Sequence, residues 1–105
     1  MTNTYQIFLI SDSTGETLER IFLSLKAQFK NIDYKVNSYS FTRTENQIHK
    51  ILDLAIKEEN SIILYTIVDN NLAKFLANTC DKKKIPCFGV LGSLILNFSK
   101  LFNQK

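Results

Sequence analysis

The most constraining feature of this sequence is an apolar pattern that changes repeatedly between strand spacing and helix spacing. Short apolar runs rich in β-branched residues precede segments in which apolar residues recur every three or four positions. Repeated βα units of this kind fold around a parallel sheet, because each helix returns the chain to the start of the next strand. With 105 residues, 45% of them hydrophobic, the chain is long enough for its own core, and we expect a single α/β domain over residues 1–105.

Four strands are predicted, and their composition indicates their places in the sheet. The third run is apolar on both faces, which predicts an interior strand, whereas Val36 alternates with polar neighbours in the second, which predicts an edge. Right-handed crossovers then give a four-stranded parallel sheet in the order 2-1-3-4, flavodoxin-like or half-Rossmann, with helices on both faces. The predicted strands are Tyr5–Ile10, Tyr34–Phe41, Ser61–Val68 and Ile85–Leu91.

Four helices are predicted between and after these strands. The first follows residue 17, and the others span Glu45–Glu59, Asn70–Lys83 and Gly92 to about Phe102. The last has an apolar face that is wide for a terminal helix, so a following segment or a second copy in a homodimer are both candidates to cover part of it. The residues expected to face inward on the first three are Leu18, Ile21, Phe22, Leu25 and Phe29, then Ile48, Ile51, Leu52, Ala55 and Ile56, then Leu72, Phe75, Leu76 and Cys80.

A polar turn follows the first strand and leads directly into the first helix. Its hydroxyl side chains and single glycine predict a helix start with unpaired backbone N–H groups, which suits a phosphate-like anion. The alternative is simple capping by Ser13 or Thr14, with a capping box from Ser13 to Glu16. Both interpretations stay open, because a cap occupies only one or two N–H groups. The predicted anion-binding residues are Ser11, Asp12, Ser13, Thr14, Gly15, Glu16 and Thr17.

Other polar residues follow the remaining strands, at the same edge of the predicted sheet. Ligands of such sheets bind beyond the carboxyl ends of the strands, where the strand order reverses. Arg43 offers a guanidinium to a phosphate or carboxylate, while Asp69 suits either a helix cap or a functional carboxylate. Asp12 could hold a metal, orient a hydroxyl nucleophile or accept N–H groups. We predict Arg43, Asp69 and Ser93 as substrate or partner contacts, and no catalytic residue or metal site.

Charge and cysteine usage exclude several classes of protein. The net charge of +3 is small and scattered, which argues against nucleic-acid and membrane-surface binding, and the basic run Lys82–Lys84 falls where it complements a helix dipole. Cys80 and Cys87 fit neither zinc-ligand nor Cys-x-x-Cys spacing, and neither begins the Cys-x5-Arg loop of a low-molecular-weight phosphatase. We expect both to be small buried hydrophobic residues. Without a signal peptide or membrane span, the protein is expected to be soluble and cytoplasmic.

Five short segments, in the same order along the chain, resemble the N-terminal half of the pyruvate, phosphate dikinase regulatory proteins. They are Ile10–Thr17, Arg43–Thr44, Leu64–Asp69, Ile85–Cys87 and Val90–Gly92. The resemblance implies an ADP-dependent serine/threonine kinase that phosphorylates a threonine of the dikinase. It also implies a pyrophosphorylase that removes this phosphate with inorganic phosphate. The implied partners are pyruvate, phosphate dikinase or phosphoenolpyruvate synthase.

One departure from the family limits what the resemblance implies. The family binds ADP through a P-loop in a C-terminal domain, but none of Gly15, Gly89 and Gly92 begins or ends Gly-x4-Gly-Lys-Ser/Thr. We therefore expect no cofactor in this chain and no activity from it alone, whether it is a cloned domain, a split gene product or a remnant. The alternative is a stand-alone module that binds phosphate or a phosphorylated metabolite.

A third hypothesis is a phospho-acceptor domain of the receiver type. Asp12, Asp69 and Ser93 follow the first, third and fourth strands, as such a domain requires. A receiver also needs a fifth strand ending in lysine and a second acidic residue beside the first, and the sequence offers neither.

Overall fold

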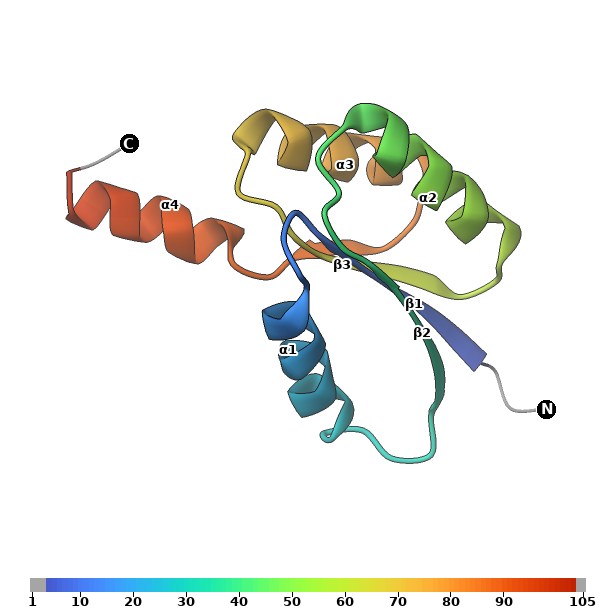
Figure 1. The fold of residues 1–105 in the computed structure, drawn as a ribbon. Coiled ribbons are helices and arrows are strands. Elements are labelled where there is room, and N and C mark those ends of the chain that lie inside the picture. The colour runs from blue at the N-terminus through green and yellow to red at the C-terminus, as the bar shows by residue number, and fades with distance from the viewer. Residues whose placement is uncertain (1–3, 104–105) are drawn as a thin grey trace.

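The computed structural model describes residues 4–103 and confirms the predicted α/β fold (Figure 1). Four parallel strands form one sheet in the order β2-β1-β3-β4, so the second strand is an edge and the third is interior, as predicted. The strands are β1 (Thr4–Ser11), β2 (Asp33–Tyr39), β3 (Ser61–Thr66) and β4 (Cys87–Gly89). The helices are α1 (Glu16–Lys26), α2 (Glu45–Lys57), α3 (Asn70–Lys83) and α4 (Gly92–Leu101).

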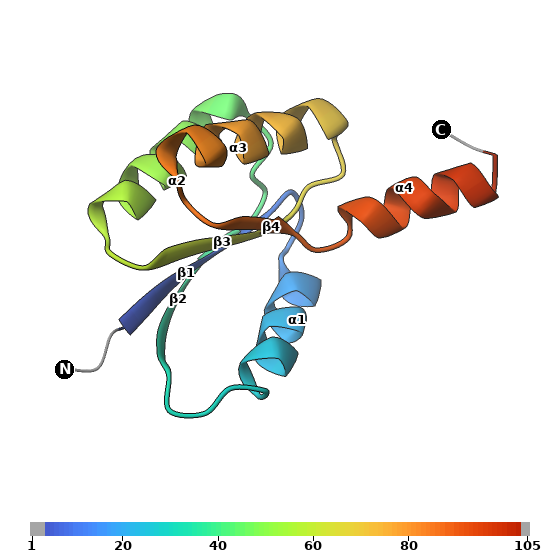
Figure 2. The same cartoon turned by 180° about the vertical axis from the view of Figure 1, so that it is seen from behind.

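The sheet is covered on both faces because its central strand alternates two sets of buried side chains. Phe8 and Ile10 of β1 face α2 and α3, whereas Ile7 and Leu9 pack against α1. Figures 1 and 2 show the resulting layers, with α2 and α3 on one side of the sheet and α1 alone on the other. Two hydrophobic clusters therefore fix the sheet, and with it the turn at the end of β1.

The bounds of α2 and α3 follow from their caps. Asp69 Oδ1 accepts the N–H of Leu72 at 3.0 Å, and α3 spans the predicted residues, with the lysine run at its end. A capping box begins α2, where Thr44 Oγ1 accepts the N–H of Gln47 at 3.2 Å. Three residues that were predicted to face inward are exposed instead: Ile56 of α2 at 49%, Leu25 of α1 at 45%, and Phe29, which lies beyond the end of α1, at 53%.

The predicted fourth strand was too long. The N–H of Ile85 bonds to the carbonyl of Cys80 at the end of α3, and Pro86 has no N–H to give to the sheet. Pairing therefore begins with the Pro86 carbonyl, which accepts the N–H of Ile63, and β4 is only three residues long. Phe88 of β4 pairs with Leu64, which faces α1, and it is 57% exposed. The face of the sheet beside α1 is therefore partly uncovered at β4.

Helix α4 does not pack on the sheet. It extends away from the edge where the strands end, on the side opposite the N-terminus, in both views (Figures 1 and 2). None of its residues is buried, although it is the most apolar helix of the chain. In the part of the chain that the structure describes, no helix is long and apolar enough to cross a bilayer.

Candidate functional site

The turn after β1 is held in place by backbone hydrogen bonds to the loop after β2. Ser11 is buried, and its Oγ accepts the N–H of Ser13 at 3.0 Å. Its carbonyl accepts the N–H of Thr42 at 2.8 Å, and the Ser13 carbonyl accepts that of Phe41 at 2.9 Å. The turn is thus a fixed part of the sheet edge, because two neighbouring strand ends bond to each other there.

Helix α1 has no side-chain cap at its N-cap position, so the capping box from Ser13 to Glu16, one of the two interpretations of the turn, does not form. The one side-chain contact to the first turn is that of Thr14 Oγ1, which accepts the N–H of Glu16 at 3.5 Å. The residue before the helix is Gly15, in the left-handed conformation at φ 85°, and it has no side chain with which to cap. Among residues 4–103, the N–H groups of Thr17 and Leu18 have no hydrogen-bond acceptor. The positive end of the α1 dipole therefore carries free N–H donors, which favours the anion interpretation of this turn.

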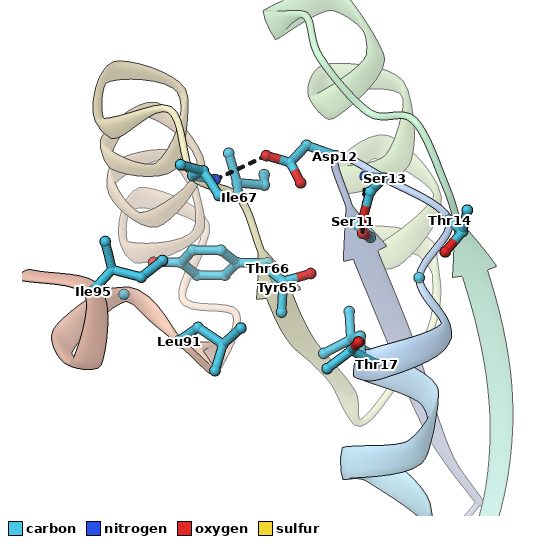
Figure 3. A pocket seen from close by; sticks show the side chains of 14 residues that line it. Ser11, Asp12, Ser13, Thr14, Thr17, Tyr65, Thr66, Ile67, Leu91 and Ile95 are labelled. Carbon is cyan, nitrogen blue, oxygen red and sulfur yellow. Dashed lines mark hydrogen bonds between the residues drawn. The ribbon is translucent and has the colours of Figure 1, made fainter. Parts of the chain in front are cut away.

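A cavity of about 160 Å³ lies against this helix start. Residues 11–15, Thr17 and Leu18 form one wall, residues 65–68 at the end of β3 form another, and Leu91, Gly92 and Ile95 complete it. Figure 3 shows the polar side chains of the turn across the cavity from Tyr65, Leu91 and Ile95. Of the predicted anion-binding residues, the structure brings all but Glu16 to this cavity.

Asp12 links the turn to the end of β3. Its Oδ2 accepts the N–H of Val68 at 2.8 Å, which is the dashed contact in Figure 3, and its own N–H donates to the Thr66 carbonyl at 3.2 Å. Of the roles left open for Asp12, the structure shows the N–H acceptor. Within residues 4–103 no group of three or more His, Cys, Asp and Glu side chains is placed to hold a metal ion.

Arg43 lies beside this cavity, on a wider depression that it shares with Asp12, Asp69 and Leu72. Its Nε donates to the carbonyl of Asp12 at 3.1 Å, and its guanidinium carbon lies 5.3 Å from the centre of the Phe41 ring. These two contacts orient the exposed side chain, and its outer nitrogens have no acceptor among residues 4–103, so they are available to an anion.

Of the other two predicted contact residues, one lies at the depression and one does not. Asp69 lies at the depression, but its Oδ1 is used as the cap of α3. Ser93 is exposed in the first turn of α4 and lines neither hollow, so the three residues of the receiver hypothesis do not converge.

The sequence did not reveal the apolar half of the cavity. Tyr65 and Leu91 were assigned to the third and fourth strands and Ile95 to the apolar face of the last helix, yet all three line the cavity. Tyr65 fits there because position 89 is glycine: a Cβ at Gly89 would lie 2.8 Å from the Tyr65 ring. That close approach is visible only once β3 and β4 are paired in register.

Burial changes the titration of two groups near β4. It raises the pKa of Tyr65, with the Cys87 and Cys80 thiols adding to the effect. The neighbouring Cys80 thiol raises the pKa of Cys87, and burial adds to it, so Cys87 stays a neutral thiol. Cys80 is fully buried as expected, Cys87 is half-buried, and neither lines the cavity.

The polar turn at the end of β1 and the strand ends around it belong to a segment that is shared with known proteins. A model of the kinase/pyrophosphorylase family matches residues 7–105, nearly the whole chain. The chain belongs to the kinase/pyrophosphorylase family.

Relatives within this family are named as pyruvate, phosphate dikinase regulatory proteins. One from Pelagibacter ubique is 74% identical over all 105 residues, and the chain covers 38% of its length. Others, from Geotalea uraniireducens and Agrobacterium fabrum, are 38% and 41% identical over 91% and 87% of the chain. The matched regions make up 35% and 33% of those two proteins. The chain therefore spans about a third of the length of these relatives.

Proposed function

We propose that this chain is the phosphate-binding part of a pyruvate, phosphate dikinase regulatory protein. The whole enzyme transfers phosphate from ADP to a threonine of the dikinase, or of phosphoenolpyruvate synthase, and removes it with inorganic phosphate. ADP binds to a part of the family's length that these residues do not cover, since they contain no Gly-x4-Gly-Lys-Ser/Thr. The enzyme acts in the cytoplasm.

One observation carries this proposal: a cavity lies where the start of α1 presents the free N–H groups of Thr17 and Leu18. A phosphate oxygen accepts such N–H groups, and the helix dipole adds favourable charge. Arg43, held nearby by the Asp12 carbonyl and the Phe41 ring, supplies a full positive charge at the same edge of the sheet.

The size of the cavity indicates which phosphate it takes. At about 160 Å³ it resembles cavities that admit a benzene-sized molecule. Sites for larger ligands usually measure about 300 Å³ or more. Inorganic phosphate therefore fits within the cavity, whereas a complete nucleotide would extend beyond it. This agrees with a reaction in which inorganic phosphate is a substrate of the dephosphorylation step.

The direct test is titration of the ¹⁵N-labelled chain with inorganic phosphate at constant ionic strength. We expect saturable shifts of the amide signals of residues 15–18, and none with chloride. Thr17→Asp places a carboxylate at the cavity wall and should weaken binding by about tenfold or more. Ser24→Asp, which adds the same charge at an exposed position of α1, is the matched control and should bind normally. Equal binding by both variants would remove the cavity as the site.

The catalytic part of the proposal is tested with a chimera. In it, these 105 residues replace the 105 matched residues of the Pelagibacter relative, a conservative exchange at 74% identity. With ADP and dikinase, the chimera should transfer phosphate, whereas the 105-residue chain alone should not. Turnover by the chain alone would show that the nucleotide site lies within it. An inactive but folded chimera that still binds phosphate would favour the stand-alone binding module.

A further inference from the structure

The feature that the proposed function leaves unexplained is the apolar surface of α4. The helix has no buried residue, and four of its apolar side chains are more than half exposed: Leu94 at 53%, Leu96 at 54%, Phe98 at 51% and Leu101 at 77%. Phe102, directly after the helix, is 63% exposed. Soluble proteins rarely leave so continuous an apolar surface without a partner.

These side chains form one stripe rather than a scatter. At 100° per residue, Leu94, Phe98, Leu101 and Phe102 lie on the same face of the helix. The rings of Phe98 and Phe102 meet edge to face, with centroids 5.6 Å apart. Leu96 lies on the opposite face, near Lys100. Four large apolar side chains along one face are the pattern of a helix that packs on one partner along its length.

The helix also needs such a partner in order to be stable. Isolated helices shorter than about 12–15 residues are marginal in water, and most helices in proteins are stabilised by packing of their apolar face. Helix α4 has 10 residues and no side-chain N-cap. Since none of its residues is buried by residues 4–103, the contacts that stabilise it must come from elsewhere.

We propose that the α4 stripe, Leu94, Phe98, Leu101 and Phe102, is the docking surface for the remaining part of the family polypeptide. The chain covers only 38% of the Pelagibacter relative, so more than half of that protein lies outside the matched region. This inference goes beyond phosphate binding and does not depend on it. It places the remaining part beside the cavity, because Ile95 of the same helix lines the cavity wall.

The charge of α4 favours this occupant over a membrane. Helices that lie on anionic bilayers carry several Lys and Arg residues on the polar face. Lys100 is the only charged residue of α4, and the other polar side chains of the helix, Ser93, Asn97 and Ser99, are neutral. A second copy of the chain would have to pair a surface of only 10 residues with itself, which is small for a stable dimer.

The experiment compares hydrogen exchange of α4 in two proteins: the 105-residue chain and the chimera with the Pelagibacter relative. We expect the amides of residues 95–101 to exchange at least about tenfold more slowly in the chimera. Phe98→Asp in the chimera should abolish this protection. Leu96→Asp is the matched control, because it places the same charge on the same helix but on the opposite face, and it should leave the protection intact.

Three results would overturn the inference. The first is equally fast exchange of α4 in the chimera and in the chain alone. The second is protection in the chain alone that rises with protein concentration while sedimentation shows a dimer, which would make a second copy the occupant. The third is protection of the chain alone on vesicles of phosphatidylserine. Phosphate titration of the same samples is an independent readout, so failure of the cavity and failure of the docking surface are told apart.

Discussion

At the residue scale, the decisive position of the site is Gly15. Capping of α1 by a hydroxyl side chain was one of the two interpretations that the sequence left open, since Ser and Thr are common caps and Ser13 and Thr14 precede the helix. The structure places a left-handed glycine before the helix, which turns the chain sharply and leaves the N–H groups of Thr17 and Leu18 without an acceptor among residues 4–103. Residue preference alone could not show this, because Ser11 and Ser13 bond to each other within the turn.

Gly15→Ala is expected to destabilise the domain by roughly 1–2 kcal/mol, because a Cβ disfavours positive φ. The free energy of unfolding in urea measures this cost. Gly92→Ala is the matched control, since Gly92 is in the first turn of α4, has no positive φ, and its added Cβ would meet nothing within 4 Å. A cost equal to that of Gly92→Ala would contradict the assigned conformation of the turn.

A second residue-scale prediction concerns Tyr65 at high pH. Burial raises its pKa in the folded state above the ordinary tyrosine value of about 10, so the unfolded chain loses this proton more readily than the folded one. The resulting stability is present below pH 10 and is lost as the pH rises through the folded pKa. Tyr65→Phe should therefore reduce the alkaline loss of stability, and absorbance titration should lose a step above pH 10. An unchanged alkaline titration would show that Tyr65 is exposed to solvent.

At the element scale, the start of α2 was easier to predict than that of α1. The capping box puts the signal in the sequence itself, because Thr44 and Gln47 have the required types and spacing. The ends of β4 were missed for the opposite reason: they depend on the Ile85 bond to Cys80 and on pairing with β3, which are tertiary contacts. Strand order was correctly predicted, because handedness and apolar pattern leave few alternatives.

Gln47 does more than cap its helix. Its Oε1 accepts the N–H groups of Arg43 at 2.7 Å and Thr44 at 3.0 Å, and its Nε2 donates to the Phe41 carbonyl at 3.3 Å. Gln47→Ala should therefore cost about 1–2 kcal/mol in urea unfolding and weaken phosphate binding through a mobile Arg43. Asn46→Ala, one residue away and also exposed, is the control and should change neither quantity by much. A loss of stability without any loss of phosphate affinity would exclude Arg43 from the site.

At the scale of the whole molecule, the sequence predicted the amphipathic pattern of α4 but not where its apolar face lies. Periodicity shows that a face is apolar, and only packing shows what covers it. The structure separates two roles at this helix. Leu91, Gly92 and Ile95 line the cavity, whereas none of the stripe residues is buried by the part of the chain that the structure describes. The cavity wall is thus attached to an element without a stabilising partner.

This arrangement predicts that phosphate binds more tightly in the chimera than in the 105-residue chain. If the start of α4 unfolds part of the time, only the molecules with an intact cavity wall bind phosphate, and the apparent affinity for phosphate falls in proportion to their fraction. Docking of α4 raises this fraction again. We expect a decrease in Kd of about threefold to tenfold on going from the chain to the chimera, measured by amide shifts or calorimetry. Phe98→Asp in the chimera should return the Kd to that of the chain alone, although Phe98 does not line the cavity, whereas Leu96→Asp should not. Equal affinities in all four proteins would mean that the wall is already fixed in the chain alone, and that docking and phosphate binding are independent.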